Sequence, residues 1–217
     1  MTSAKKLLKL PPFKPELYVK RTVSASFWKD SNDLLWRANI FQRQIGHDTL
    51  STKAKTYVDI VMAIECSLKS LIVSLSRESE TPEEAYLVAR SCSHHLDRLY
   101  AEVRVRAKNR VRLLTPDKER IIIKANSLGV GYRYDVTAFM FLSREDWVDR
   151  SQKKGLVSSV INHDFINQLN VAAHELNTLS NKTLDKCLGW YARVNTSRWK
   201  EVNDRHSQFL STLGRRF

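Results

Sequence analysis

The chain has little glycine or proline, few cysteines and no long apolar run. Its 217 residues include six glycines and five prolines, and three of those prolines lie within the first fifteen residues. Few turns are therefore encoded. No apolar run approaches the roughly 18 residues that a membrane span needs, and residues 1–10 lack the small-residue cleavage site of a secretory signal. We therefore expect a soluble protein with no membrane partner.

Cysteine is too scarce and too scattered for a disulfide framework. Cys66, Cys92 and Cys187 are odd in number, far apart and set in helical patterns. These features favour reduced thiols, and hence a cytoplasmic location. The sequence has no metal-ligand spacing such as Cys-x-x-Cys or His-Glu-x-x-His, and no phosphate-binding glycine loop. It therefore predicts neither a metal ion nor a bound cofactor.

Basic residues outnumber acidic ones. Lysine and arginine number 36 against 23 aspartates and glutamates, which gives a formal net charge of +13 and an isoelectric point near 9.8. A field of this sign attracts polyanions. We therefore expect a nucleic-acid partner, RNA or DNA, ahead of an anionic membrane surface or an acidic protein.

Apolar residues recur every three or four positions through most of the chain, which is the period of an α-helix. The clearest stripe runs from Tyr57 to Leu75. Thr81 and Glu84 form a capping box with Pro82 at the first helical position, so a third helix begins there. The sequence predicts an all-α fold with helices over about 27–44, 52–76, 82–106, 116–128, 156–179 and 181–213, and residues 136–142 as a buried helix or a short strand.

The chain divides into three predicted parts. Residues 1–26 carry several lysines around a proline-rich centre and are interpreted as a basic arm that is flexible or packed in extended form. Residues 27–142 form a helical bundle. Residues 143–217 form a C-terminal extension of two helices packed on that bundle.

One short constellation in the third predicted helix can carry chemistry. Arg90 precedes His95 with four residues between them, and Ser91 and His94 belong to the same segment. Metal-free RNA cleavage needs a group that moves protons near neutral pH, and histidine, with an ordinary pKa of about 6.5, supplies it. It also needs a fixed cation beside the phosphate, and arginine can bind two phosphate oxygens at once.

Several segments around this motif are similar to the HEPN superfamily, helical-bundle domains whose active members are ribonucleases with an Arg-x(4–6)-His motif. These segments are Trp-Arg-Ala at 36–38, Ala-Ile-Glu-Cys-Ser-Leu-Lys at 63–69 and His-His-Leu-Asp-Arg-Leu at 94–99. A Tyr-Arg-Tyr-Asp turn at 132–135 resembles the Arg-Tyr segment that often closes these domains. The resemblance covers about residues 27 to 137. It implies a HEPN-like helical bundle with additional C-terminal helices.

The resemblance implies a metal-independent endoribonuclease, in which the ribose 2′-hydroxyl attacks the adjacent phosphate and leaves a cyclic phosphate end. Arg90 matches the motif arginine, which stabilises phosphate charge, and His95 matches the motif histidine, the general acid or base. Ser91 occupies the polar position that often follows the arginine, as an orienting hydrogen-bond partner, and His94 is the second choice of histidine. The resemblance also implies a homodimer with a shared cleft and a toxin or phage-defence role.

Helical geometry leaves the choice of histidine open. On a straight helix, five positions correspond to about 500°, so Arg90 and His95 would lie about 140° apart, whereas Arg90 and His94 would share a face. A kink, a long arginine reach or contributions from two subunits would bring Arg90 and His95 together. His95 also lies beside the apolar stripe, so a core or interface histidine without a catalytic role is the alternative interpretation.

A run of cations follows the motif: Arg98, Arg104, Arg106, Lys108, Arg110 and Arg112. As a nucleic-acid-binding edge, these residues would contact several phosphates at once and give RNA binding a steep salt dependence. Alternatively, they form a solvated helix end, where cations are favourable. Two rivals to the nuclease follow. One is a non-catalytic HEPN-like module that binds RNA or a nucleotide, and the other is a helical adaptor for an acidic, antitoxin-like or regulatory protein partner.

Overall fold

The computed structural model describes residues 14–43, 50–108, 110–127, 162–188 and 198–214. Within these ranges every regular element is a helix, so the prediction of an all-α fold is confirmed. The helices are α1 (Pro15–Arg43), α2 (Leu50–Ser74), α3 (Pro82–Ser91), α4 (Leu96–Ala107), α5 (Pro116–Ser127), α10 (His163–Leu188) and α11 (Trp199–Gly214). The predicted segment 136–142 and the turn at 132–135 lie outside the described residues.

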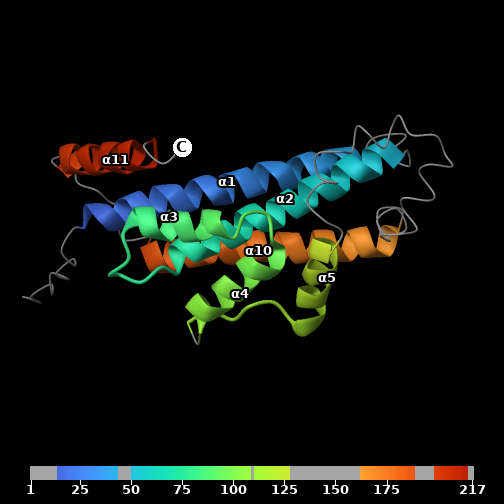
Figure 1. Ribbon diagram of the computed structural model, residues 1–217. Helices are drawn as coiled ribbons and strands as arrows, with labels where there is room; N and C mark the ends of the chain where they lie inside the picture. The colour runs from blue at the N-terminus through green and yellow to red at the C-terminus, as the bar shows by residue number, and fades with distance from the viewer. Residues whose placement is uncertain (1–13, 44–49, 109, 128–161, 189–197, 215–217) are drawn as a thin grey trace, which may run out of the picture.

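Three long helices form the core. α1, α2 and α10 lie alongside one another, and each contacts the other two (Figure 1). The apolar stripe predicted along α2 is fully buried at Ile60, Ile64 and Leu68. These side chains belong to one buried cluster with Leu35 of α1 and Leu169 of α10. Each fully buried side chain of this size contributes roughly 1.5–3 kcal/mol relative to exposure.

A seam of serines joins the three core helices. Ser70 of α2 lies 2.9 Å from Ser24 of α1 and 2.7 Å from Ser180 of α10, measured between hydroxyl oxygens. Ser31 of α1 and Ser67 of α2 are paired in the same way at 2.7 Å. A buried hydroxyl is costly without a hydrogen-bond partner, and each of these has one. The small side chains therefore let the helices approach closely without leaving polar groups unsatisfied.

The predicted capping box at the start of α3 is confirmed. The Thr81 N–H donates to the Glu84 carboxylate at 2.8 Å, and the Glu84 N–H donates to the Thr81 hydroxyl at 3.2 Å. Pro82 occupies the first turn, where its missing N–H is tolerated. Beyond α3, the short helices cover the core from one side, with α4 against α2 and α5 against both α4 and α10.

The prediction of one continuous helix from this cap to about residue 106 is wrong. α3 ends at Ser91 and α4 starts at Leu96. Between them Ser93 has a φ of 51°, a left-handed conformation that does not continue a right-handed helix. The chain therefore turns at residues 92–95, where both motif histidines lie.

The N-terminal region differs from the predicted basic arm over residues 1–26. α1 already begins at Pro15, since proline is compatible with the first turn of a helix. Leu17 and Val23 are buried, so this stretch has a core-facing side that its lysines and prolines obscure in the sequence. Lys20 is buried as well, and its Nζ donates to the Arg77 carbonyl oxygen at 2.7 Å.

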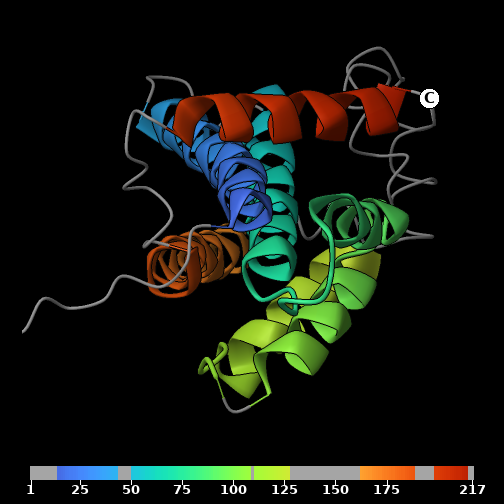
Figure 2. The same ribbon diagram turned by 90° about the vertical axis from the view of Figure 1, so that its left-hand side faces the viewer.

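The C-terminal region also differs from the prediction. α10 continues to Leu188 through the helix break predicted near residues 179–181, because Ser180 faces Ser70 in the core rather than capping a new helix. α10 contributes to the same buried cluster as α1 and α2, and the boundary predicted at 142/143 lies outside the described residues. α11 lies across the N-terminal half of α1 and contacts α3 (Figure 2).

Candidate functional site

The turn between α3 and α4 places His94 against α2. Its Nδ1 lies 3.0 Å from each carboxylate oxygen of Glu65. Glu65 is buried, whereas the His94 side chain keeps 37% of its surface exposed. A carboxylate that holds one ring nitrogen fixes the orientation of an imidazole, as proton-transferring histidines require. The turn therefore builds a histidine–carboxylate pair that is accessible to solvent.

Glu65 also binds a buried lysine. Lys69, one turn further along α2, places its Nζ 2.6 Å from Glu65 Oε1. Burial acts to raise the pKa of Glu65, but the hydrogen bonds and charges of Lys69 and His94 outweigh it, so that pKa is lowered. Glu65 is therefore charged at neutral pH. We refer to Glu65, Lys69 and His94 as the Glu65 cluster.

Arg90 lies exposed at the C-terminal end of α3, beside Tyr86. Its Nη1 is 3.4 Å from the Tyr86 hydroxyl, and its guanidinium carbon is 5.9 Å from the centre of the ring. The Tyr86 ring is stacked on Phe27 of α1 at 6.0 Å and meets Phe209 of α11 edge-on at 5.8 Å. The last turns of α3 thus present an arginine whose neighbouring tyrosine is fixed by two other helices.

The other two motif residues contribute to the backbone turn. Ser91 donates its hydroxyl to the Val88 carbonyl oxygen at 2.9 Å, within the last turn of α3. His95 is the N-cap of α4, where its carbonyl oxygen accepts from the Leu99 N–H at 2.9 Å, but its side chain makes no capping hydrogen bond. Because α3 and α4 are separate helices, the straight-helix angle between Arg90 and His95 does not apply.

Two of the six predicted RNA-binding cations are engaged in ion pairs. The Arg106 guanidinium donates to both oxygens of Glu80, at 2.8 and 2.7 Å, and to Glu102 at 2.6 Å. Arg104 forms an ion pair with Glu119 of α5. Arg106 is the more buried of the two, with 10% of its side chain exposed. These contacts fix α4 to the loop before α3 and to α5.

The other four predicted cations are exposed. Arg98 lies near the start of α4, whereas Lys108, Arg110 and Arg112 lie in the segment that joins α4 to α5. The structure thus brings three of the predicted residues together in one connecting segment and leaves Arg98 near the turn that carries His94.

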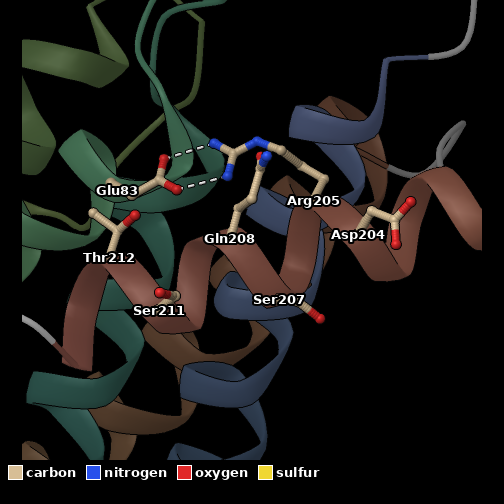
Figure 3. Close-up of a pocket in the computed structure, with 7 residues that line it drawn as sticks. All are labelled: Glu83, Asp204, Arg205, Ser207, Gln208, Ser211 and Thr212. Atoms are coloured by element: carbon tan, nitrogen blue, oxygen red, sulfur yellow. Dashed lines mark hydrogen bonds and ion pairs between the residues drawn. The ribbon is translucent and has the colours of Figure 1, made fainter.

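A surface hollow of about 850 Å³ lies between α3 and α11 (Figure 3). Arg205 of α11 reaches across it and donates to both carboxylate oxygens of Glu83, at 2.6 and 2.7 Å. This hydrogen bonding lowers the pKa of Glu83. Because Arg205 joins Glu83 across it, we interpret the hollow as the contact that holds α11 on α3 rather than as a ligand site.

The described residues show two further features that bear on chemistry. In that part of the chain, no three His, Cys, Asp or Glu side chains gather where they could hold a metal ion. Burial raises the pKa of Cys66 to about 12, so this thiol is protonated at neutral pH and is a poor nucleophile. Across the same ranges, no helix combines the length and the apolar character needed to cross a membrane.

No match for this chain was found among protein-family models, curated proteins or solved structures. The resemblance to the HEPN superfamily therefore stays a prediction, and the candidate site rests on its geometry. The sequence motif favours His95 over His94 and does not indicate the roles of Glu65 and Lys69. The signal that could have found these two is a pair of opposite charges, one helical turn apart, within the most apolar helical stretch of the chain.

Proposed function

We propose that the protein is a metal-independent endoribonuclease whose proton-transferring residue is His94. The observation that carries this proposal is the pairing of a partly exposed imidazole with a buried, charged carboxylate, His94 Nδ1 to Glu65 at 3.0 Å. Because Glu65 engages Nδ1, a proton exchanged with a substrate would pass through Nε2. The proposal moves the catalytic role from His95, which the motif favoured, to its neighbour.

In the proposed reaction, His94 takes the proton of a ribose 2′-hydroxyl. The 2′-oxygen forms a bond to the adjacent phosphorus, the bond from phosphorus to the 5′-oxygen breaks, and the leaving 5′-oxygen takes up a proton. The His94 of a second copy, across the cleft of a homodimer, donates that proton. The products are a 2′,3′-cyclic phosphate end and a 5′-hydroxyl end.

Arg90 supplies the charge that this reaction needs. Negative charge on the phosphate increases as the 2′-oxygen attacks, and a guanidinium held in position stabilises it. Arg90 is exposed at the end of α3, and its contact with Tyr86 restricts its position. The net charge of +13 further raises the local concentration of RNA around the molecule.

The test incubates the purified full-length chain with a short fluorescent RNA in EDTA. We expect cleavage that leaves 2′,3′-cyclic phosphate ends, and no cleavage of the 2′-O-methyl form of the same RNA. Arg90→Ala should slow cleavage by about a hundredfold. The matched control is Arg120→Ala, which removes an exposed cation on α5. Cleavage that EDTA abolishes, or no cleavage at all, would contradict the proposal.

A second candidate is a non-catalytic RNA-binding bundle. The observation that favours it is the buried Lys69, which balances the charge of Glu65 inside the core and so suits the Glu65 cluster to holding the α3–α4 turn in place. In that case wild-type protein and Arg90→Ala would bind the 2′-O-methyl RNA with salt-sensitive affinity, and neither would cleave RNA.

A further inference from the structure

A groove of about 570 Å³ runs along α10, beside the segment that joins α4 to α5. Residues 112–115 line one side and one face of α10 lines the other. On α10 the lining extends from Asn170 to Lys182, twelve residues further on, which corresponds to about 18 Å of helix. The groove is therefore long enough for linked units of a polymer.

The charges at this groove favour an anionic occupant. Arg112 from the connecting segment and Lys182 from α10 are both exposed along it. His174 adds an exposed imidazole, whose Nε2 lies 3.4 Å from Asn39 Nδ2 of α1. The carboxylate that lines the groove, Glu175, is balanced by an ion pair with Lys118 of α5. An extended anion would therefore find positive charge from both sides of the groove.

The floor of the groove is apolar. Leu113, Leu114 and Leu179 line it, and Val171 beside them is 51% exposed, which leaves apolar surface in contact with water. Covering such surface with a flat apolar group is favourable.

We propose that this groove binds the unpaired nucleotides of an RNA strand. Its phosphates contact Arg112 and Lys182, while its bases lie on the apolar floor and stack on the ring of His174. A duplex offers phosphates but keeps its bases stacked inside, so it cannot use the floor. The inference deepens the proposed function, on which it rests, by naming single-stranded RNA as the substrate class.

Binding is tested separately from cleavage with a fluorescein-labelled 2′-O-methyl oligouridine of about ten nucleotides, which 2′-hydroxyl attack cannot cleave. Fluorescence anisotropy reports affinity. We expect Arg112→Glu with Lys182→Glu to bind about tenfold more weakly than Lys29→Glu with Arg120→Glu, a control with the same net charge that alters exposed cations elsewhere. Equal affinities would overturn the proposal, because the overall charge alone would then account for binding.

The floor is tested by Val171→Asp against Leu210→Asp, which alters an apolar residue on α11 that is 55% exposed. We expect Val171→Asp to weaken binding about fivefold more than the control, and a hairpin duplex to bind wild-type protein less tightly than the single strand. Equal affinity of the two variants or of the two RNA forms would overturn the proposal. So would displacement of the probe by uridine monophosphate or by an acidic peptide, since the groove would then suit a free nucleotide or a protein.

A measurement on the wild-type protein covers the case in which a variant fails to fold, as judged by circular dichroism. A 2′-O-methyl strand that carries one 4-thiouracil base is photocrosslinked to the full chain, and the attached peptides are identified by mass spectrometry. We expect crosslinks to peptides that contain residues 112–115 and 170–182. Crosslinks to other peptides alone would overturn the proposal. Cleavage activity has no influence on any of these results, so loss of the groove proposal and loss of the nuclease proposal are distinguishable.

Discussion

At the residue scale, the candidate site depends on how a single buried carboxylate is shared. Glu65 Oε1 lies 2.6 Å from Lys69 Nζ and 3.0 Å from His94 Nδ1. Lys69 comes from the same helix as Glu65, whereas His94 comes from the α3–α4 turn. The lysine therefore stabilises the charge of Glu65, and that charge in turn orients the histidine.

Lys69→Met removes one partner of this buried pair. We expect the free energy of unfolding to fall by roughly 3 kcal/mol, because the substitution leaves a buried carboxylate without its strongest cation. Urea unfolding followed by circular dichroism measures the change. Lys55→Met, which alters an exposed lysine on the same helix, should stay within about 0.5 kcal/mol of wild type. A Lys69→Met protein as stable as wild type would show that the pair does not stabilise the fold.

Stability should fall in acid, because Glu65, Glu80 and Glu83 all have a lowered pKa. For Glu80, burial acts to raise the pKa, but the hydrogen bonds and charge of Arg106 outweigh it. A group with a lowered pKa in the folded state binds fewer protons there than in the unfolded chain. Its contribution is therefore complete above the ordinary value of 4.5 and is lost as the pH falls through the lower, folded value.

Melting temperatures measured from about pH 6 to about pH 3 test this dependence. We expect the melting temperature of the wild type to decline steeply as the pH falls. The decline should be shallower for Glu80→Gln, because glutamine carries no charge beside Arg106 that protonation could remove. Glu78→Gln, which alters an exposed carboxylate in the same loop, is the control and should keep the wild-type slope. If Glu80→Gln declines as steeply as the wild type, the Arg106–Glu80 pair is not the source of the acid sensitivity.

At the element scale, helix starts could be predicted from the sequence better than helix interruptions. The α3 cap is local, since Thr81 and Glu84 satisfy each other within one turn. The end of α3 depends on residues distant in the sequence, because the chain turns at Ser93 and His94 then pairs with Glu65 on another helix. Ser180 is a second case. The sequence around it resembles a helix break, but its hydroxyl pairs with Ser70 across the core and the helix continues.

α11 is held on α3 by one strong polar contact and a small apolar face. Arg205→Ala removes both hydrogen bonds to Glu83 and the longer ion pair with Glu16 of α1 at 4.0 Å, while buried Val202, Phe209 and Leu213 still pack. We therefore expect amide hydrogen exchange in α11 to speed up by about tenfold through local opening, with α2 unchanged.

Hydrogen exchange with mass spectrometry measures this effect peptide by peptide. Lys200→Ala, which alters an exposed lysine on the same helix, should leave exchange in α11 at the wild-type rate. Unchanged exchange in Arg205→Ala would contradict the interpretation of the α3–α11 hollow as the contact that anchors this helix. Faster exchange that spreads equally through α2 would show that the contact serves the whole fold instead.

At the scale of the whole molecule, the fold class could be predicted but the membership of the core could not. The periodic stripe of α2 predicts a buried helix without any other knowledge. No pattern within the sequence of α10 itself indicates that this helix packs against α1 and α2. Its contacts join distant residues, as with Ser180 and Ser70, which lie more than a hundred residues apart in the chain. The motif spacing from Arg90 favours His95, whereas the pairing of His94 with Glu65 joins residues on different elements and leaves no local pattern in the sequence.

The role of His94 is best tested by comparing it with the neighbouring histidine, His95. RNA cleavage in EDTA is timed for wild type, His94→Ala and His95→Ala, each checked for folding by circular dichroism. We expect His94→Ala to slow cleavage by about a hundredfold or more, whereas His95→Ala should stay within a few-fold of wild type. Loss of cleavage in His95→Ala with activity retained in His94→Ala would contradict this expectation, because the Glu65–His94 pair would then be structural and the proton-transferring group would lie at the N-cap of α4.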